Sequence, residues 1–324
     1  MNVRRTTLAL AAFMTATLAH GAAGFDLQGH RGARGLAPEN TLAAFRTALA
    51  IGVTTLETDL AVTKDDVVVV SHEPALYPPL VRLDGAWLAA PGPPIRSLTL
   101  AELRRFDIGR TDPASAYGRS FPEQQAADGE RFPTLDDVYA LAAASGKPVR
   151  FNVETKITPT SGATTVDAET FARLVVARIA AAGMERRTTV QSFDWRTLVA
   201  VKRLAPGIET VCLTSEGGSF DTVKADDTGR SPWHAGLALA DHGGSIPALV
   251  AAAGCAVWSP NHASVTRDRL ADAKARGLRV VPWTVNNPAD MARLVDWNVD
   301  GLITDYPDRA RRVLAEKGFK SGSD

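Results

Sequence analysis

The sequence predicts an α/β fold, a (β/α)8 TIM barrel with a long insertion after the third strand. Short apolar runs alternate with helical patterns along most of the chain. Repeated strand–helix units produce a parallel sheet with helices outside it. This number of units in a chain of 324 residues favours a closed barrel.

We expect nine strands and eight main helices. The strands are expected at 25–29, 54–60, 67–72, 149–154, 188–193, 208–214, 255–260, 279–285 and 300–304. The helices are expected at 41–51, 134–145, 167–182, 195–204, 246–253, 266–276, 288–296 and 307–317. The first helix has Asn40 or Thr41 as its N-cap, and the second has Thr134 or Asp136.

Nine strands exceed the eight positions of the barrel, and the second and third are joined by a link too short for a helix. This link is Thr63-Lys64-Asp65-Asp66. Either an extended return reaches the third strand, or 59–63 and 67–72 form a hairpin with its turn at 64–66. Both arrangements bring Asp59 near His72, and the sequence does not decide between them.

Two long segments interrupt the strand–helix rhythm. Residues 74–132 are rich in Pro, Gly and aromatic residues, and residues 216–245 are rich in Gly, Asp and Ser. Both follow strand ends, where barrel enzymes build their active sites. We therefore expect them to form walls or lids over the site.

The N-terminus has the pattern of a secretory signal peptide. Arg4 and Arg5 precede an apolar run of about 6–19, and small residues follow it. The run is too short for a membrane span. We expect residues 1–23 to be the signal peptide, 24–324 to be one barrel domain, and the protein to be exported, periplasmic or secreted.

Composition and charge exclude several partners. The chain has 36 basic and 36 acidic residues, so no basic excess supports nucleic-acid binding and no stable membrane insertion is expected. The oligomeric state stays open. Cys212 and Cys255 lie in separate apolar runs, and we expect free buried thiols there rather than the disulfide that an exported protein permits.

Three carboxylates predict a metal site. Glu57 and Asp59 are two apart on a strand, so both point to the same face. Glu154 follows another strand end. Like charges at one strand edge repel, and one divalent cation, Mg²⁺ or Ca²⁺, would relieve the repulsion. A solvated strand end is the alternative for the Glu57–Asp59 pair alone.

Two histidines and two cations surround these acids in the sequence. His30 and His72 each end an apolar strand, which suits a general acid and a general base. Arg31 and Lys156 could bind phosphoryl oxygens, or they could balance the charge of neighbouring glutamates.

An ordered set of motifs resembles the glycerophosphodiester phosphodiesterase family. The motifs are His30-Arg31-Gly32, Pro38-Glu39-Asn40-Thr41, Glu57-x-Asp59, Ser71-His72-Glu73, Val153-Glu154-Thr155-Lys156, Gln191-Ser192-Phe193, Trp283-Thr284-Val285-Asn286 and Gly301-Leu302-Ile303-Thr304-Asp305. In this sequence Asp66 and Glu73 stand where the family commonly has glycine and aspartate.

The resemblance implies a TIM barrel that cleaves a small-molecule phosphodiester. It implies catalysis by His30 and His72, metal binding by Glu57, Asp59 and Glu154, and substrate contact by Trp283. The implied route runs through a cyclic phosphate to glycerol 3-phosphate and an alcohol. The alternatives are a phospholipase acting on lysophospholipids or phosphoinositides and a non-catalytic glycerophosphodiester-binding protein. Residues 304–307 equally fit a simple strand-to-helix cap.

Overall fold

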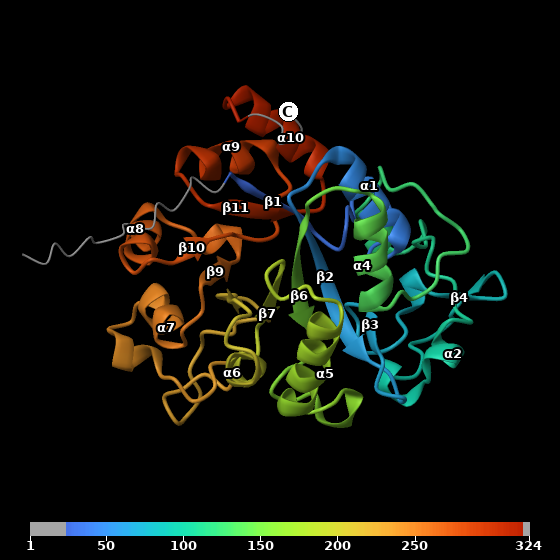
Figure 1. The fold of residues 1–324 in the computed structure, drawn as a ribbon, viewed down its shortest axis with the longest axis horizontal. Helices are drawn as coiled ribbons and strands as arrows, with labels where there is room; N and C mark the ends of the chain where they lie inside the picture. Colours follow the sequence, from blue (N-terminus) through green and yellow to red (C-terminus); the bar gives the residue numbers. More distant parts are fainter. Residues whose placement is uncertain (1–23, 320–324) are drawn as a thin grey trace, which may run out of the picture.

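The structure, a computed structural model, describes residues 24–319. The expected signal peptide, residues 1–23, lies outside the described residues. Figure 1 shows helices arranged around a ring of strands, with the segment that contains α2 (Leu100–Leu103) and β4 (Arg82–Leu83) at one side. The predicted barrel is therefore confirmed.

Eight parallel strands form the barrel. They are β1 (Asp26–Gly29), β2 (Thr55–Val62), β6 (Arg150–Thr155), β7 (Thr188–Ser192), β8 (Thr210–Thr214), β9 (Val257–Pro260), β10 (Arg279–Val280) and β11 (Gly301–Thr304). Their order around the sheet is β10-β9-β8-β7-β6-β2-β1-β11. Each barrel strand thus lies beside the strands that precede and follow it in this set, as expected for right-handed crossovers.

Backbone hydrogen bonds between the last two strands complete the ring. The amide of Asp300 donates to the carbonyl of Val280, and the amide of Ile303 donates to that of Pro282. The strand predicted at 279–285 is shorter in the structure, ending at Val280. Pro282 lacks an amide hydrogen and cannot continue the regular ladder, which explains the difference.

The third predicted strand forms a hairpin with the second and takes no place in the barrel. β3 (Val68–Val70) pairs with β2 in antiparallel fashion, with Leu60 opposite Val70. Asp66 in the turn has φ +60°, a left-handed conformation that aspartate tolerates and for which glycine is usual. Of the two arrangements left open by the sequence, the hairpin is the one observed.

The eight predicted main helices are all present, with ends within a residue or two of the predictions. They are α1 (Leu42–Ile51), α4 (Leu135–Ala144), α5 (Ala168–Ala181), α6 (Trp195–Leu204), α7 (Ile246–Ala252), α8 (Arg267–Ala275), α9 (Pro288–Asp296) and α10 (Pro307–Glu316). Thr41 and Thr134 cap the first two, each accepting a backbone hydrogen bond through its hydroxyl. Each helix buries an apolar stripe against the strands, which forms the main core.

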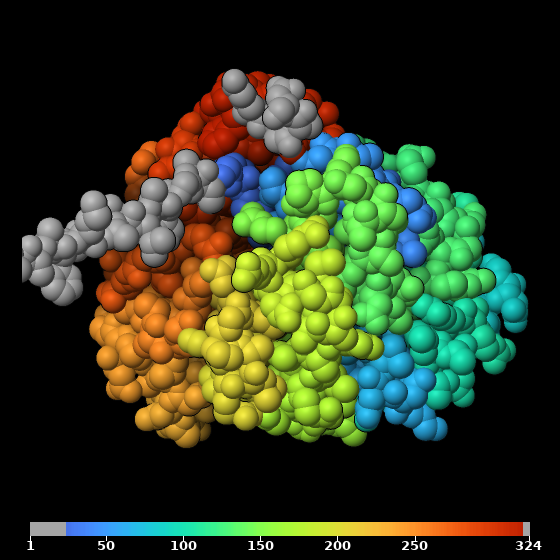
Figure 2. All heavy atoms as spheres, viewed as in Figure 1, coloured from blue at the N-terminus to red at the C-terminus, as the bar shows by residue number. Residues whose placement is uncertain are grey.

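The segment between β3 and α4 forms a layer at one side of the barrel. It contains β4, β5 (Ala86–Trp87), α2, α3 (Ala116–Arg119) and the short 3₁₀ turns η1 (Pro78–Leu80) and η2 (Ile95–Ser97). Its apolar side chains, such as Leu76 and Leu103, pack on Val69 in a cluster separate from the main core. Figure 2 shows this segment in cyan to teal along one side of the molecule.

The second long segment, 216–245, is mostly irregular, with one 3₁₀ turn, η4 (Leu239–His242). Further short turns, η3 (Gly162–Thr164) and η5 (His262–Ser264), follow β6 and β9. Across residues 24–319, no helix has the length and apolar character needed to cross a bilayer.

The prediction of free thiols is wrong. Cys212 on β8 and Cys255, just before β9, form a disulfide with an S–S distance of 2.07 Å. β8 and β9 are neighbours in the barrel, so two residues 43 apart in sequence meet across adjacent strands. The pairing depends on this strand order, which apolar patterning does not specify.

Candidate active site

The predicted site residues gather at the carboxyl ends of the barrel strands. A cavity of about 200 Å³ opens there, lined by thirteen residues. Seven of the eight predicted site residues line it: His30, Arg31, Glu57, His72, Glu154, Lys156 and Trp283. The eighth, Asp59, does not line the cavity but contacts two residues that do, Arg31 and Lys156. Strand ends from across the sequence therefore supply one site.

The three predicted metal-binding carboxylates form one cluster. Glu57, Asp59 and Glu154 each offer an oxygen, and these oxygens lie within 4.8 Å of one another. The strand register brings them together, because Asp59 on β2 lies directly opposite Glu154 on β6. All three side chains are buried.

Neighbouring groups leave part of this cluster free to bind a cation. Glu57 accepts hydrogen bonds from the Arg31 amide at 2.8 Å and from Gln191 Nε2 at 2.7 Å, one on each oxygen. Asp59 Oδ1 is buried and meets no hydrogen-bond donor in the described part of the chain. A buried, unsatisfied carboxylate oxygen is costly, and a hard divalent cation would satisfy it. The donor set therefore fits Mg²⁺ or Ca²⁺.

The cluster is electrostatically strained. Burial, reinforced by the charge of Asp59, raises the pKa of Glu57 well above its usual value. Burial likewise raises the pKa of Glu154 to about 7, although Lys156 opposes this. Burial also acts to raise the pKa of Asp59, but Arg31 and other nearby cations outweigh it and keep that pKa low. Asp59 thus holds its charge, and the two glutamates resist ionisation.

The two predicted phosphate-binding cations lie against these acids. Arg31 Nη1 donates to Glu39 at 2.6 Å, and its Nε lies 3.1 Å from Asp59. Lys156 Nζ donates to Glu154 at 2.7 Å and lies 3.7 Å from Asp59. Both therefore balance charge, as one alternative expected, and both also line the cavity where a phosphate could reach them.

His30 is held by a carboxylate from the far end of the sequence. Its Nδ1 lies 2.6 Å from Asp305 Oδ1. Burial would raise the pKa of Asp305, but His30 and Arg34 hold it well below its usual range, so Asp305 is ionised and accepts only. The proton therefore sits on Nδ1 of His30. Burial and the charge of Arg34 lower the pKa of His30, which leaves Nε2 as an unprotonated base at neutral pH.

His72 lies on the other side of the acids and is more exposed. Its Nδ1 contacts Glu73 Oε1 at 2.7 Å. Burial, together with Arg31 and Lys156, lowers the pKa of His72 well below its ordinary value. Both imidazoles are thus neutral at neutral pH, and each has a carboxyl partner on one nitrogen.

Aromatic side chains close one side of the cavity. Trp283 and Phe193 both line it, and their ring centroids lie 5.3 Å apart. The Trp283 indole N–H donates to the Ser259 carbonyl at 3.0 Å, which fixes the ring in the wall. From the 216–245 segment, Phe220 packs on Phe193 with a centroid distance of 4.9 Å.

Sequence reasoning missed several residues that hold the site together. Asp305 is no helix cap: it also accepts from Arg34 Nε at 2.8 Å and from Asn286 Nδ2 at 2.7 Å. Tyr117, from the 74–132 segment, donates its hydroxyl hydrogen to Glu39, which in turn binds Arg31. The sequence signal for Arg34 is weak, consisting only of its position four residues after His30.

Asn40 is one of the two N-caps expected for the first helix. It has φ +56°, and Thr41 is the cap. Its Nδ2 donates to Asp59 Oδ2 at 2.9 Å, and its Oδ1 accepts from the Thr58 hydroxyl. Asn40 therefore orients Asp59 from behind the cavity.

Comparison with known proteins decides the family. The model of the glycerophosphoryl diester phosphodiesterase family matches residues 30–309. The chain belongs to this family. It is accordingly an enzyme, a phosphoric diester hydrolase, and the matched range contains every residue of the site described above.

Relatives of the family match over most of their length. A glycerophosphodiester phosphodiesterase of Bacillus subtilis is 28% identical over 293 residues, which cover 90% of this chain and 86% of the relative. The crystal structure of a putative glycerophosphoryl diester phosphodiesterase from Silicibacter pomeroyi has 34% identity and a TM-score of 0.81, covering 92% of this chain and 95% of that one. An Oleispira antarctica phosphodiesterase, solved with the product sn-glycerol-3-phosphate, has 21% identity and a TM-score of 0.65, covering 90% and 97%.

Proposed function

We propose that this enzyme hydrolyses glycerophosphodiesters, such as glycerophosphocholine, to glycerol 3-phosphate and an alcohol, with one divalent cation and two-histidine acid–base catalysis. One observation carries the proposal: three buried carboxylates and two neutral histidines surround the same cavity of about 200 Å³. A binding protein would have no need of two such proton carriers.

Glu57, Asp59 and Glu154 would hold the cation, which is Mg²⁺ or Ca²⁺. When bound, the cation would polarise the phosphodiester and offset the charge that develops in the transition state. Arg31 and Lys156 line the same cavity and would bind the remaining phosphoryl oxygens. Phosphate binding would draw the Arg31 and Lys156 side chains partly away from their present carboxylate partners.

His30 is suited to accept a proton. Its Nδ1–H donates to Asp305, so its Nε2 lone pair is free, and the same carboxylate would stabilise the imidazolium that forms. His72 would serve the other oxygen. It is neutral in the unliganded site, so it would first take up a proton from solvent, which the negative charge of a bound phosphodiester favours, and would then deliver that proton to the leaving alcohol. The opposite assignment, with His72 as the base and His30 as the acid, would use the same two residues.

The substrate is a small-molecule phosphodiester. The Oleispira relative binds sn-glycerol-3-phosphate as product, which supports a glyceryl side to the substrate. Trp283, fixed in the cavity wall beside Phe193, would pack against the apolar surface of the glyceryl group or the departing alcohol.

Release of glycerol 3-phosphate from glycerophosphocholine tests the function. Purified residues 24–324 would be assayed with EDTA and then with Mg²⁺ or Ca²⁺ restored. We expect release only with a cation. Release that EDTA leaves unchanged would contradict the metal role. No release with either ion, but cleavage of a lysophospholipid, would favour the phospholipase alternative.

Export of the protein is part of the proposal. The N-terminal pattern of residues 1–23 predicts a signal peptide, and the Cys212–Cys255 disulfide is typical of an oxidising compartment. N-terminal sequencing of the protein recovered from a periplasmic fraction, compared with the cytoplasmic fraction, tests both points. An intact Met1 in the cytoplasm would contradict export.

A further inference from the structure

The interior of the barrel is apolar on one side and polar on the other. Strands β8, β9 and β11 and the residue after β10 contribute a small apolar cluster whose buried members are Val211, Val257, Val281 and Ile303. Strands β1, β2, β6 and β7 instead contribute the buried Gln28, Thr55, Glu57, Asn152 and Gln191 and the half-buried Thr189. Barrel interiors are usually filled by branched apolar side chains, so this polar half needs a physical reason.

These polar side chains form one chain of hydrogen bonds through the barrel. At the end opposite the active site, Gln28 Nε2 donates to Asp26 at 2.8 Å. Asn152 Nδ2 donates to Gln28 Oε1 and to Gln191 Oε1, both at 2.9 Å. Gln191 Nε2 then donates to Glu57 at 2.7 Å. The chain thus runs from one mouth of the barrel to the proposed cation site.

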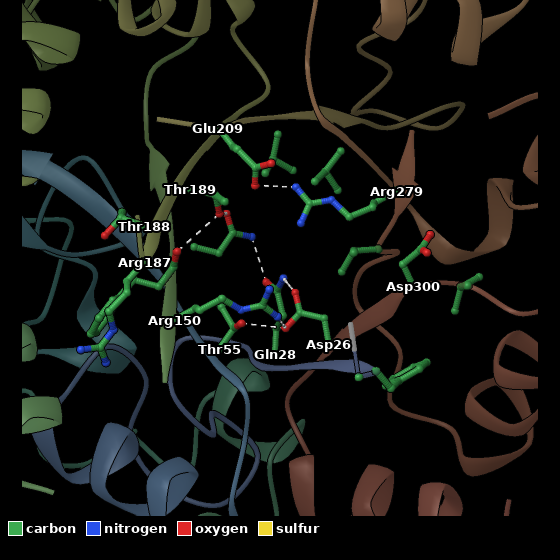
Figure 3. Close-up of a pocket in the computed structure, with 18 of the residues that line it drawn as sticks. Asp26, Gln28, Thr55, Arg150, Arg187, Thr188, Thr189, Glu209, Arg279 and Asp300 are labelled. Atoms are coloured by element: carbon green, nitrogen blue, oxygen red, sulfur yellow. Dashed lines mark hydrogen bonds and ion pairs between the residues drawn. The ribbon is translucent and has the colours of Figure 1, made fainter. Parts of the chain in front are cut away.

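The outer end of the chain is firmly anchored. It lies in a cavity of about 540 Å³ at the mouth where the strands begin. Figure 3 shows Asp26, Gln28, Thr55 and Arg150 together there, joined by dashed lines. Asp26 Oδ1 accepts from Thr55 at 2.6 Å and lies 2.8 Å from Arg150 Nη2. In Figure 2 the face shown is hollowed near its centre, between the blue, green and red segments.

The direction of every bond in this chain is determined. At one end Asp26 accepts from Gln28, and at the other end both Glu57 oxygens accept, from Gln191 and from the Arg31 amide. Each glutamine therefore turns its NH₂ toward a carboxylate and its oxygen toward Asn152. Only a group that donates in both directions can join the two glutamine oxygens, and the Asn152 NH₂ does so. Asn152 Oδ1 is satisfied in turn by the Thr189 hydroxyl at 2.9 Å. The Asn152 amide is therefore fully hydrogen-bonded and has one orientation.

We propose that Asn152 and Gln191 are positioning residues that set the geometry of Glu57 for the cation. This inference rests on the proposed cation site. Asn152 prevents Gln191 from rotating its amide by 180°, a change that would place Oε1 against the Glu57 carboxylate. Glu57 then keeps one donor on each oxygen, from Gln191 and from the Arg31 amide, and presents its remaining lone pairs to the cation.

A merely structural role makes a different prediction. Replacing one partner of a buried hydrogen bond leaves the other unsatisfied and costs about 1–3 kcal/mol of stability, whatever the role of the bond. Groups that orient a metal ligand, by contrast, typically change metal affinity by about 10–100-fold when they are removed. Affinity for the cation therefore distinguishes the two roles, whereas stability alone does not.

The experiment measures Ca²⁺ and Mg²⁺ affinity by titration calorimetry on the folded, full barrel, together with the thermal unfolding midpoint in EDTA. The variants are Gln191→Met and Asn152→Leu, both near-isosteric. We expect the dissociation constant to rise by about 10–100-fold in each. The matched control is Thr155→Val. Thr155 lies on β6, as Asn152 does, and its hydroxyl is hydrogen-bonded to Thr197 of α6, outside the barrel interior.

The outcomes separate the inference from the function on which it rests. Weakened binding in both variants with an unchanged control supports the positioning role of Asn152 and Gln191. Equal affinity in the parent and all three variants overturns this role alone. Equal weakening in Thr155→Val also overturns it, because the loss of any buried hydrogen bond of β6 would then weaken binding. If the parent protein binds neither ion, the cation site fails and the positioning role with it. Should Asn152→Leu not fold, Gln191→Met and Gln28→Met decide in the same way.

Discussion

Replacing Asp305 by asparagine tests how His30 is held. Asp305 contacts His30 Nδ1 at 2.6 Å and Arg34 Nε at 2.8 Å. In Asp305→Asn the amide keeps the shape of the side chain, but its charge is gone and its NH₂ must face a donor. His30 then either rotates or shifts its proton to Nε2, where it no longer acts as a base.

The expected loss has an upper limit that follows from the geometry. Proton transfer by a positioned side chain typically contributes about 10²–10⁴-fold to the rate. Because Asp305 reaches the cavity only through its partners, Asp305→Asn should cost no more than His30→Ala. We expect kcat to fall by about 10²–10⁴-fold in either variant, with a smaller change in KM.

A double-mutant cycle provides the assay. Rates of glycerol 3-phosphate release would be measured for the parent, the two single variants and the double variant. If Asp305 acts through His30, adding Asp305→Asn to His30→Ala changes the rate little, because the two effects are not additive. Fully multiplicative losses would refute the reasoning. Unfolding midpoints must accompany the rates, since Arg34 loses a buried partner, which can cost about 3–5 kcal/mol.

Four further outcomes are expected. His72→Ala should lower kcat by about 10²–10⁴-fold with the fold intact by circular dichroism, and a near-normal rate would remove His72 from the mechanism. Burial raises the pKa of Glu154 from 4.5 to about 7, so the metal-free folded protein loses stability as pH rises through this window. Glu154→Gln should therefore raise the unfolding free energy of the metal-free protein at pH 8 by up to about 3 kcal/mol. Calorimetry should show that the same variant has lost Ca²⁺ binding. Buried His234 has its pKa lowered from 6.5 to about 4, so stability should fall by up to about 3 kcal/mol as pH drops through that window in urea titrations, and His234→Phe should flatten this slope. Replacing Cys212 and Cys255 by alanine should cost about 2–4 kcal/mol in the same titrations, and no loss would show that the crosslink does not stabilise the barrel.

The sequence was sufficient for the elements but not for all of their pairings. Apolar runs bounded by turn residues predicted every barrel strand, because the strand face that packs against the helices is apolar even where the interior face carries polar side chains. The number of strands was harder. The run at 67–72 is as apolar as a barrel strand, yet Val69 packs under the 74–132 layer in its own cluster. An apolar run therefore predicts that a strand is buried, but it does not predict which part of the molecule covers the strand.

The candidate site was predicted where chemistry is local and missed where it depends on distant contacts. Glu57 and Asp59 share one strand face, so their proximity follows from a period of two. Asp305 is 275 positions from His30, and the two meet only because β1 and β11 are neighbours. Tyr117 reaches Glu39 from an insertion whose course no periodic pattern describes.

The polar half of the barrel links these observations. The carboxylate cluster at the strand ends is costly in itself, since burial opposes the ionisation of Glu57 and Glu154. Ordinary apolar packing below it could not hold such groups in one geometry, because they would rotate or take up protons. Directed hydrogen bonds can do so, and the chain through Asn152 has only one arrangement between its two carboxylate ends. The barrel therefore places amides where most barrels place valine and isoleucine, and the hydrogen bonds of these amides would preorganise Glu57 before any ligand arrives.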